Sequence, residues 1–183
     1  MKINRMSAVV ISLVLVLGGS FAKAKVTFSS LQNRLDTQFV EGTDHDGYSI
    51  ASDIEAKINI VKNTITVADR VQGLDEDVIM EAKEAVETLE NSSKINDVAE
   101  RESRMDTALN HLLDKMEAAG ISEKDRNYIH GFKADYKAAD HRIKLDPYHE
   151  MVIETEKKTS GALAGILKTL TFSSVDVYRT GGR

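Results

Sequence analysis

The chain contains no cysteine and no tryptophan, and it has a single proline, Pro147. Without cysteine it can form no disulfide, no thiolate metal site and no cysteine nucleophile, although the redox compartment stays undecided. Aromatic residues make up only 5% of the 183 residues. Strand-rich chains depend on aromatic and β-branched residues and on turn residues, so this composition favours helices.

Basic residues are not concentrated in any part of the chain, and the formal net charge is -5. Nucleic-acid binding needs clustered Lys and Arg, so we expect no nucleic-acid partner. Charged residues make up 29% and hydrophobic residues 42% of the sequence. This balance is typical of a folded domain, and the length suffices for one domain with a sizeable core.

An uncharged, largely apolar run covers residues 6–22, after a basic start. As a helix it would span about 26 Å at about 1.5 Å per residue, slightly less than a bilayer core of about 30 Å. The basic start, the apolar middle and the Ala-Lys-Ala ending at 22–24 also fit a cleavable signal peptide. Residues 1–24 are therefore either an export signal cut near Ala24 or a single transmembrane anchor.

This segment determines the expected location. We expect a single-pass protein of the bacterial inner membrane, held through its N-terminal helix, with the bulk of the chain in the periplasm. The alternative is a soluble periplasmic protein after cleavage near Ala24. Basic residues lie on both sides of the run, so the positive-inside rule barely discriminates. The signal-like order favours export of the C-terminal bulk of the chain.

Beyond this segment, apolar residues recur at steps of three and four, which is the period of one helix face. Ser52 with Glu55 resembles a capping box, and Ser122 offers a later cap. Asp146 precedes Pro147, which is tolerated at a first helical position. The periodic segments cover residues 28–39, 54–71, 78–89, 98–116, 129–143 and 148–170.

The connections between these segments are short, so consecutive helices should pack as antiparallel neighbours. We therefore predict an all-α fold, an antiparallel helical bundle of about four to five helices after the N-terminal hydrophobic helix. The bundle domain should cover residues 25–172, and residues 173–183 should form a C-terminal tail.

The stretch EGTDHDGYSI, residues 41–50, resembles a cation-binding loop. With Gly47 as the sixth residue of an EF-hand loop, Asp44 and Asp46 take the third and fifth positions. The first position then falls on Gly42 and the twelfth on Asp53, so the two anchoring positions do not match. We interpret the stretch as a linker between helices; a weak cation site that includes His45 is the alternative.

A second group of possible ligands lies close together in sequence, but Pro147 interrupts the helix between its members. A turn could bring these residues together, but we interpret the group as a capped and solvated helix junction, and no His-x-x-x-His spacing occurs. His111 and His130 stand singly in amphipathic segments, where a surface position is expected. The group consists of Asp140, His141, Asp146, His149 and Glu150.

Sequence signatures of catalysis are missing as well. There is no Gly-x-Ser-x-Gly elbow, no phosphate-binding glycine loop after a strand, and no Glu-x-x-His pair for a di-iron bundle. We therefore expect a protein that is not an enzyme, with no catalytic residues, no cofactor and no metal. No small-molecule substrate can be identified.

The stretch TSGALAGILKTLTF, residues 159–172, combines two glycines four residues apart with four large aliphatic residues. Gly161 and Gly165 permit a close helix approach. We expect a last helix that closes the bundle; the alternative is an interfacial or partner-docking helix.

Four stretches together resemble the LemA family of bacterial membrane-anchored helical-bundle proteins. They are FSSLQNRLDTQ after the apolar run, IEAKINIVKNTITVA at 54–68, DHRIKLDPYHEMV at 140–152 and ALAGILKTLTFSSVDVY at 162–178. Asn59, Ile60 and Val61 match the family's Asn-Leu-Val step, and Arg142, Ile143 and Tyr148 match its Tyr-Asn region near an Arg-Ile pair.

The chain departs from the family in lacking its paired arginines and the proline before Asn59, and in having His149 where asparagine is usual. The resemblance implies a membrane helix, the bulk of the chain on one side, and no established enzymatic activity. The family's usual topology has a short outside N-terminus, which differs from the signal-like order here, so the sidedness stays open.

The sequence thus predicts a non-enzymatic, membrane-anchored or exported helical-bundle protein of the LemA-like type. It would act as an interaction or scaffold module of the cell envelope, with other envelope proteins as partners. The alternative is a metal-binding protein or metal-dependent enzyme that uses Asp44–Asp46 or the Asp140–Glu150 group. A third hypothesis is peripheral lipid binding through residues 161–172.

Overall fold

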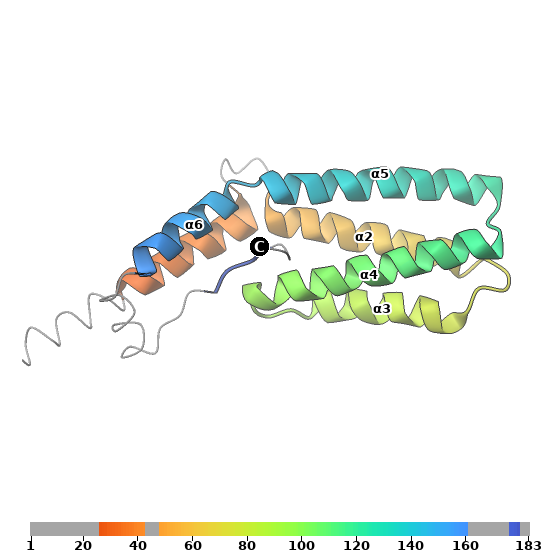
Figure 1. The fold of residues 1–183 in the computed structure, drawn as a ribbon, viewed down its shortest axis with the longest axis horizontal. Helices are drawn as coiled ribbons and strands as arrows, with labels where there is room; N and C mark the ends of the chain where they lie inside the picture. The colour runs from red at the N-terminus through yellow and green to blue at the C-terminus, as the bar shows by residue number, and fades with distance from the viewer. Residues whose placement is uncertain (1–25, 43–47, 161–175, 180–183) are drawn as a thin grey trace, which may run out of the picture. The chain divides into compact units, whose positions relative to one another are not determined.

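The computed structural model describes residues 26–42, 48–160 and 176–179, and every regular element in them is helical. The all-α prediction is confirmed for this part of the chain. A first helix covers residues 26–41. The others are α2 (Ile50–Ala68), α3 (Glu76–Glu90), α4 (Ile95–Ala119), α5 (Glu123–Leu145) and α6 (Tyr148–Thr159) (Figure 1).

The hydrophobic N-terminal helix and the helix continuation to residue 170 were predicted for residues outside the described ranges. Within those ranges, no helix combines the length and the apolar character that a membrane crossing requires.

The chain forms two compact units. The described residues of the first are 26–36 and 150–160, where Phe28, Leu35 and Val152 are buried. The second holds residues 37–149 and 176–179 apart from the undescribed 43–47, and it contains α2 to α5.

Ion pairs show how α2, α3 and α5 are oriented. Lys62 of α2 pairs with Glu90 at the end of α3, whereas Asp69, just after α2, pairs with Lys83 in the middle of α3. The residue numbers rise on one helix as they fall on the other, so α2 and α3 are antiparallel. By the same reasoning α5 is antiparallel to α2, because Asp53 pairs with Arg142 and Lys57, one turn later on α2, pairs with Asp140, which comes before Arg142 on α5.

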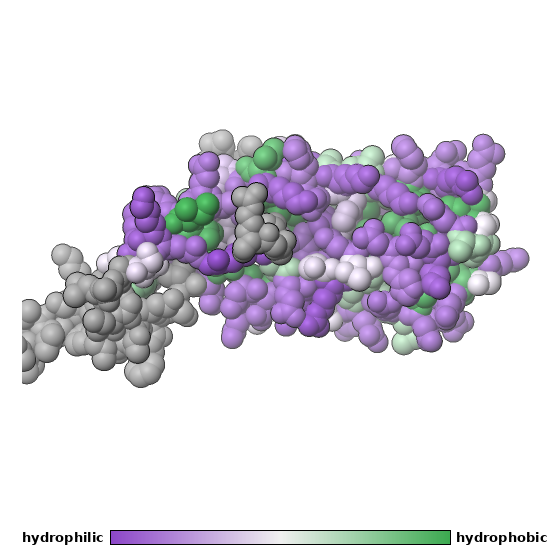
Figure 2. Space-filling model, in the orientation of Figure 1, coloured by the Kyte–Doolittle hydropathy of each residue, from purple (hydrophilic) through white to green (hydrophobic). Residues whose placement is uncertain are grey.

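The apolar stripes of the sequence face the interior of the second unit. Ile54, Ile58, Val61 and Ile65 of α2 are all buried. The apolar stripe of α3 is also buried from Val78 to Leu89, and that of α4 is buried from Met105 to Met116. Over α2 to α5, the face drawn in Figure 2 is mainly hydrophilic, with hydrophobic residues visible between the helices. Burial of these stripes is the main favourable contribution to helix packing.

The start of α2 differs from the prediction by one helical turn. Ser49 is the N-cap: its hydroxyl accepts a hydrogen bond from the Ser52 N–H at 3.1 Å, and the Ser52 hydroxyl accepts one from the Ser49 N–H at 2.9 Å. The Ser52–Glu55 box was therefore wrong. The earlier start adds fully buried Ile50 to the stripe four residues before Ile54, and this burial favours the longer helix.

The other helix ends follow local signals more closely. Asp75, Ser122 and Asp146 each accept a backbone N–H two or three residues ahead. Helix α4 ends at Gly120, whose φ of 83° is left-handed. Helix α2 ends at Ala68, earlier than the predicted end near residue 71.

Candidate functional site

Lys57 is the most unusual residue of the second unit, because its side chain is completely buried. It lies on α2 three residues after Ile54 and four before Val61, so it shares the face that carries the apolar stripe. A lysine is rarely buried unless its ammonium group is paired.

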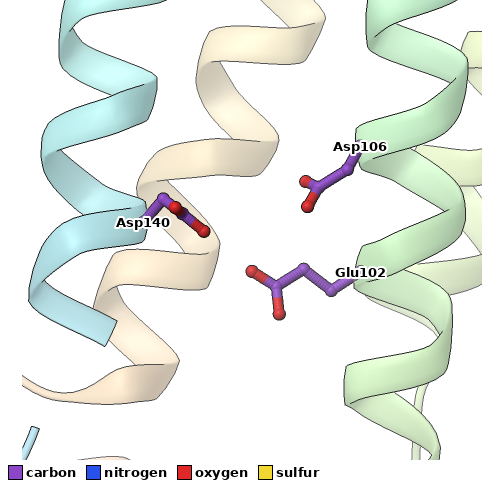
Figure 3. Close-up of side chains that lie close together, drawn as sticks. All are labelled: Glu102, Asp106 and Asp140. Atoms are coloured by element: carbon purple, nitrogen blue, oxygen red, sulfur yellow. The ribbon is translucent and has the colours of Figure 1, made fainter. Parts of the chain in front are cut away.

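Three carboxylates surround the Lys57 ammonium. Its Nζ lies 2.5 Å from Oε1 of Glu102, 3.1 Å from Oδ1 of Asp106 and 3.6 Å from Oδ1 of Asp140. Glu102 and Asp106 are four residues apart on α4, which places both on one face. Figure 3 shows these two side chains extending from α4 toward Asp140 on α5. The pairs therefore connect α2 with two helices that are distant in sequence.

Two tyrosines complete the group. The Tyr136 hydroxyl donates a hydrogen bond to Asp106, and its ring centroid lies 4.6 Å from Lys57 Nζ. The Tyr178 hydroxyl donates a hydrogen bond to Oε2 of Glu102. We call Lys57, Glu102, Asp106, Tyr136, Asp140 and Tyr178 the ionic cluster.

Exposure increases across the ionic cluster from its inner to its outer side. The side chain of Lys57 is 0% exposed and that of Glu102 7%, whereas those of Asp106 and Asp140 are 39% and 33% exposed. Lys144 lies on the outer side and pairs with Asp140 at 2.6 Å. The innermost pair is therefore removed from water, and its ions depend on each other.

The electrostatics of the ionic cluster keep Lys57 charged. Burial alone would lower the pKa of its ammonium, but the charges of Glu102 and Asp106 and their hydrogen bonds outweigh burial and raise the pKa. Burial would likewise raise the pKa of Asp140, but the hydrogen bond from Lys144 and the charges of Lys57 and Lys144 lower it. The folded state therefore favours the charged forms of Lys57 and Asp140, which attract each other.

Both tyrosines of the ionic cluster have a strongly raised pKa. Burial is the main cause, and the carboxylates of Asp106 and Glu102 add to it because a phenolate beside them would be repelled. The folded state therefore favours the neutral phenols, which donate hydrogen bonds to the carboxylates.

This predicts a loss of stability at alkaline pH. A raised folded-state pKa contributes stability below the unfolded value, which is 10.0 for tyrosine, and that contribution is lost as the pH rises above it. Each group can contribute about 1.4 kcal/mol per pH unit to this loss. Urea denaturation at pH 8 and pH 11 should show a smaller difference for Tyr136→Phe and Tyr178→Phe than for the wild type.

Tyr128→Phe is the matched control for these variants, because Tyr128 lies on α5 but is exposed and outside the ionic cluster. We expect it to keep the wild-type pH dependence. If all three variants behaved alike, the phenols would not be responsible for the alkaline loss.

The three carboxylates of the ionic cluster also have the composition of a metal site. One oxygen from each of Glu102, Asp106 and Asp140 lies within 4.8 Å of the others. Hard cations such as Ca²⁺ and Mg²⁺ prefer such ligands. The Lys57 ammonium, however, already lies within 3.6 Å of all three carboxylates. A metal would have to displace this internal cation, so the arrangement fits a structural ion cluster better.

A cleft of about 410 Å³ opens beside the ionic cluster and is lined by α2, α4 and α5. Asp106, Tyr136 and Asp140 line its polar part. Lys133 of α5 pairs with Glu117 of α4 at 2.9 Å. The apolar lining residues are Ile60, Leu109, Leu113 and Phe132.

Comparison with models of known protein families, with curated proteins and with solved structures found no match for this chain.

The predicted ligand residues fall in different places. Asp44, His45, Asp46 and Gly47 lie outside the described residues. The described helices on either side end at residue 41 and begin at Ile50.

The members of the Asp140–Glu150 group take different partners. Asp140 joins the ionic cluster, whereas Asp146 caps α6 by accepting the Tyr148 N–H at 2.8 Å. His149 Nε2 lies 2.8 Å from the Ile143 carbonyl oxygen, and His141 is exposed. Among the described residues, only Glu102, Asp106 and Asp140 form a group of three possible metal ligands.

The remaining candidates lie on the surface or outside the described ranges. His111 pairs with Glu81 through Nδ1 at 2.9 Å, and His130 is exposed. The pair Gly161 and Gly165 and the possible lipid-binding stretch 161–172 are not described.

The residues that carry the LemA resemblance are mainly structural in this chain. Arg142 donates two hydrogen bonds to Oδ1 of Asp53, at 2.8 and 2.5 Å. Ile143, Tyr148 and Val61 are buried.

Sequence reasoning did not identify most of the ionic cluster. One signal was present, because Lys57 interrupts the apolar face of α2 and Glu102 lies on the same face of α4 as Met105 and Leu109. Opposite charges on two apolar stripes could have suggested a buried pair. No sequence signal indicated that Tyr178 belongs to the ionic cluster, because its segment shows no helical period.

Proposed function

We propose that this chain is a non-enzymatic, membrane-anchored or exported helical-bundle protein of the LemA-like type, acting as an interaction or scaffold module of the cell envelope. The apolar run at 6–22 and the family resemblance support the location. The ionic cluster supports the non-enzymatic part of the proposal. In this proposal, the antiparallel helices of the chain would follow the N-terminal hydrophobic helix.

One observation carries the proposal: the Lys57 ammonium occupies the space among Glu102, Asp106 and Asp140. A metal held by these three carboxylates would need that space. Among the described residues, the one buried side-chain polar atom without a hydrogen bond is the Ser92 hydroxyl, which lies outside the ionic cluster. A fully paired cluster of this kind holds helices in place and leaves the outer surfaces for partners.

Amine reactivity separates a structural lysine from a reactive one. Because Lys57 is buried and its pKa is raised, we expect it to resist acetylation by dilute acetic anhydride at pH 7 in the native protein. Lys62, which is half-exposed on the same helix, should be acetylated under these conditions and serves as the internal control. Mass spectrometry of peptides reads out both sites. Preferential acetylation of Lys57 would contradict a purely structural role.

The location is tested by fractionation of native cells and by the N-terminal residue of the mature protein. We expect the chain in the membrane or periplasmic fraction. An intact Met1 would indicate an anchor, whereas a start near Lys25 would indicate release. Recovery of the whole population as a soluble cytosolic protein would overturn the location.

The alternative is a metal-binding protein or metal-dependent enzyme that uses Asp44–Asp46 or the Asp140–Glu150 group. Asp140 lies within 4.8 Å of two other carboxylates, which is the observation in its favour. Titration with Ca²⁺ and Zn²⁺ should leave the melting temperature unchanged at millimolar ion if Lys57 is the resident cation. A rise that Asp140→Asn abolishes would favour this alternative over the main proposal.

A further inference from the structure

The segment at 176–179 returns to the second unit and inserts one side chain into it. Tyr178 is completely buried, although its segment forms no helix or strand. Its ring centroid lies 5.6 Å from that of Phe39 and 6.2 Å from that of His149. We call Phe39, Glu102, Tyr148 and His149 the Tyr178 socket.

Two hydrogen bonds determine what the Tyr178 socket accepts. The backbone N–H of Tyr178 donates to the Tyr148 hydroxyl at 2.9 Å, and its phenol donates to Glu102. The other oxygen of Glu102 accepts from Lys57 at 2.5 Å. A tyrosine thus completes the coordination of a buried carboxylate, whereas a phenylalanine would leave one of its oxygens without a donor.

Tyr178 is the one completely buried residue of the segment 176–179. Asp176 and Val177 are half-buried and Arg179 is exposed. A phenol with its own backbone N–H in a non-helical stretch is a feature that a separate peptide can supply. The Tyr178 socket therefore has the chemistry of a peptide-recognition site: an aromatic pocket, a buried anion for the hydroxyl and an acceptor for the main chain.

We propose that the Tyr178 socket is a binding site for a tyrosine-bearing peptide segment, occupied in cis by residues 176–179 and in trans by the same segment of a second copy of this chain. Exchange of an identical element between two copies preserves every contact and is a common route to dimers. The tethered segment competes at a high effective concentration, so the cis form prevails until it is released. This site does not depend on where the protein resides.

A peptide titration tests the site. The probe is a fluorescein-labelled peptide of residues 176–183, DVYRTGGR, titrated with full-length Tyr178→Ala and followed by fluorescence anisotropy. We expect saturable binding to this variant and at least tenfold weaker binding to the wild type, whose own segment competes. The same peptide with phenylalanine for tyrosine should bind about tenfold more weakly, because it lacks the donor to Glu102.

Controls make the titration decisive. Circular dichroism checks that Tyr178→Ala retains its helices. If it does not fold, Tyr178→Phe replaces it, because this variant keeps the ring contacts but loses the bond to Glu102, and it should still bind the peptide better than the wild type. No binding to a folded variant, or equal binding of a peptide with alanine in place of Tyr178, would overturn the site.

The second copy is tested by mixing two full-length variants. Tyr178→Ala keeps the Tyr178 socket but has no tyrosine to insert, and Phe39→Ala keeps the tyrosine but lacks one wall of the socket. Sedimentation at about 100 µM should show that each variant alone is monomeric and that the mixture forms heterodimers. A mixture that stays monomeric would overturn the exchange between copies, even if the peptide binds.

Discussion

Replacing Lys57 with methionine should lower the free energy of unfolding at pH 7 by about 3–5 kcal/mol. Methionine fills a similar volume but leaves the Glu102 carboxylate, which is 7% exposed, beside Asp106 without its cation. An uncompensated buried charge costs far more than the net gain of most ion pairs. Urea denaturation followed by circular dichroism measures the change.

Lys62→Met is the matched control, because it removes an ion pair from the same helix. Lys62 lies 2.6 Å from Glu90, but both side chains are almost half exposed. Exposed pairs contribute about 0–1 kcal/mol, so we expect a loss within that range. Adding Glu102→Gln to Lys57→Met should recover part of the stability, because the buried charge is then gone. Equal losses for the two lysines, or strict additivity with Glu102→Gln, would contradict a buried ionic cluster.

Replacing Gly42 with alanine should have the second largest effect, a loss of about 2–4 kcal/mol. Gly42 has a φ of +75°, which costs any other residue about 1–2 kcal/mol. In addition, an alanine Cβ would lie 2.0 Å from the Tyr48 carbonyl oxygen, so the backbone must move. Urea denaturation measures the change, and the helix content of the folded variant should stay close to that of the wild type.

Gly120→Ala separates the two causes. Gly120 has a similar φ of +83°, but a Cβ there would meet nothing within 4 Å. We expect only the conformational cost of about 1–2 kcal/mol. The difference between the two variants then measures the close approach of residue 42 to Tyr48. If Gly120→Ala and Gly42→Ala lowered the free energy of unfolding equally, the close approach of residue 42 to Tyr48 would not contribute to the loss.

Most of the helical architecture could be predicted because its signals are local. Apolar residues three and four apart identified the stripes of α2 to α5, and Ser122 and Asp146 marked helix starts. The start of α2 was misplaced because Ser49 and Ser52 both offer a cap three residues before another polar side chain. Burial of Ile50, a tertiary effect, decides between them.

The candidate site could be predicted only in small part. Asp140 was among the possible ligands, but the sequence placed it with His141 and Asp146, which take other partners or the surface. The position of Lys57 on the apolar face of α2 could have suggested a buried pair. Its partners on α4 and α5 could not be identified, because local spacing does not reveal which carboxylates meet it.

The sequence by itself determined the helical class, the main helix spans, several caps and the apolar faces, because each depends on residues within one or two turns. Only the tertiary structure decided the ionic cluster and the Tyr178 socket. Lys57 meets Glu102 across 45 residues, and Glu102 meets Tyr178 across 76. Such contacts depend on how whole helices pack together, and hydrophobic burial drives that packing without specifying which charged groups will meet.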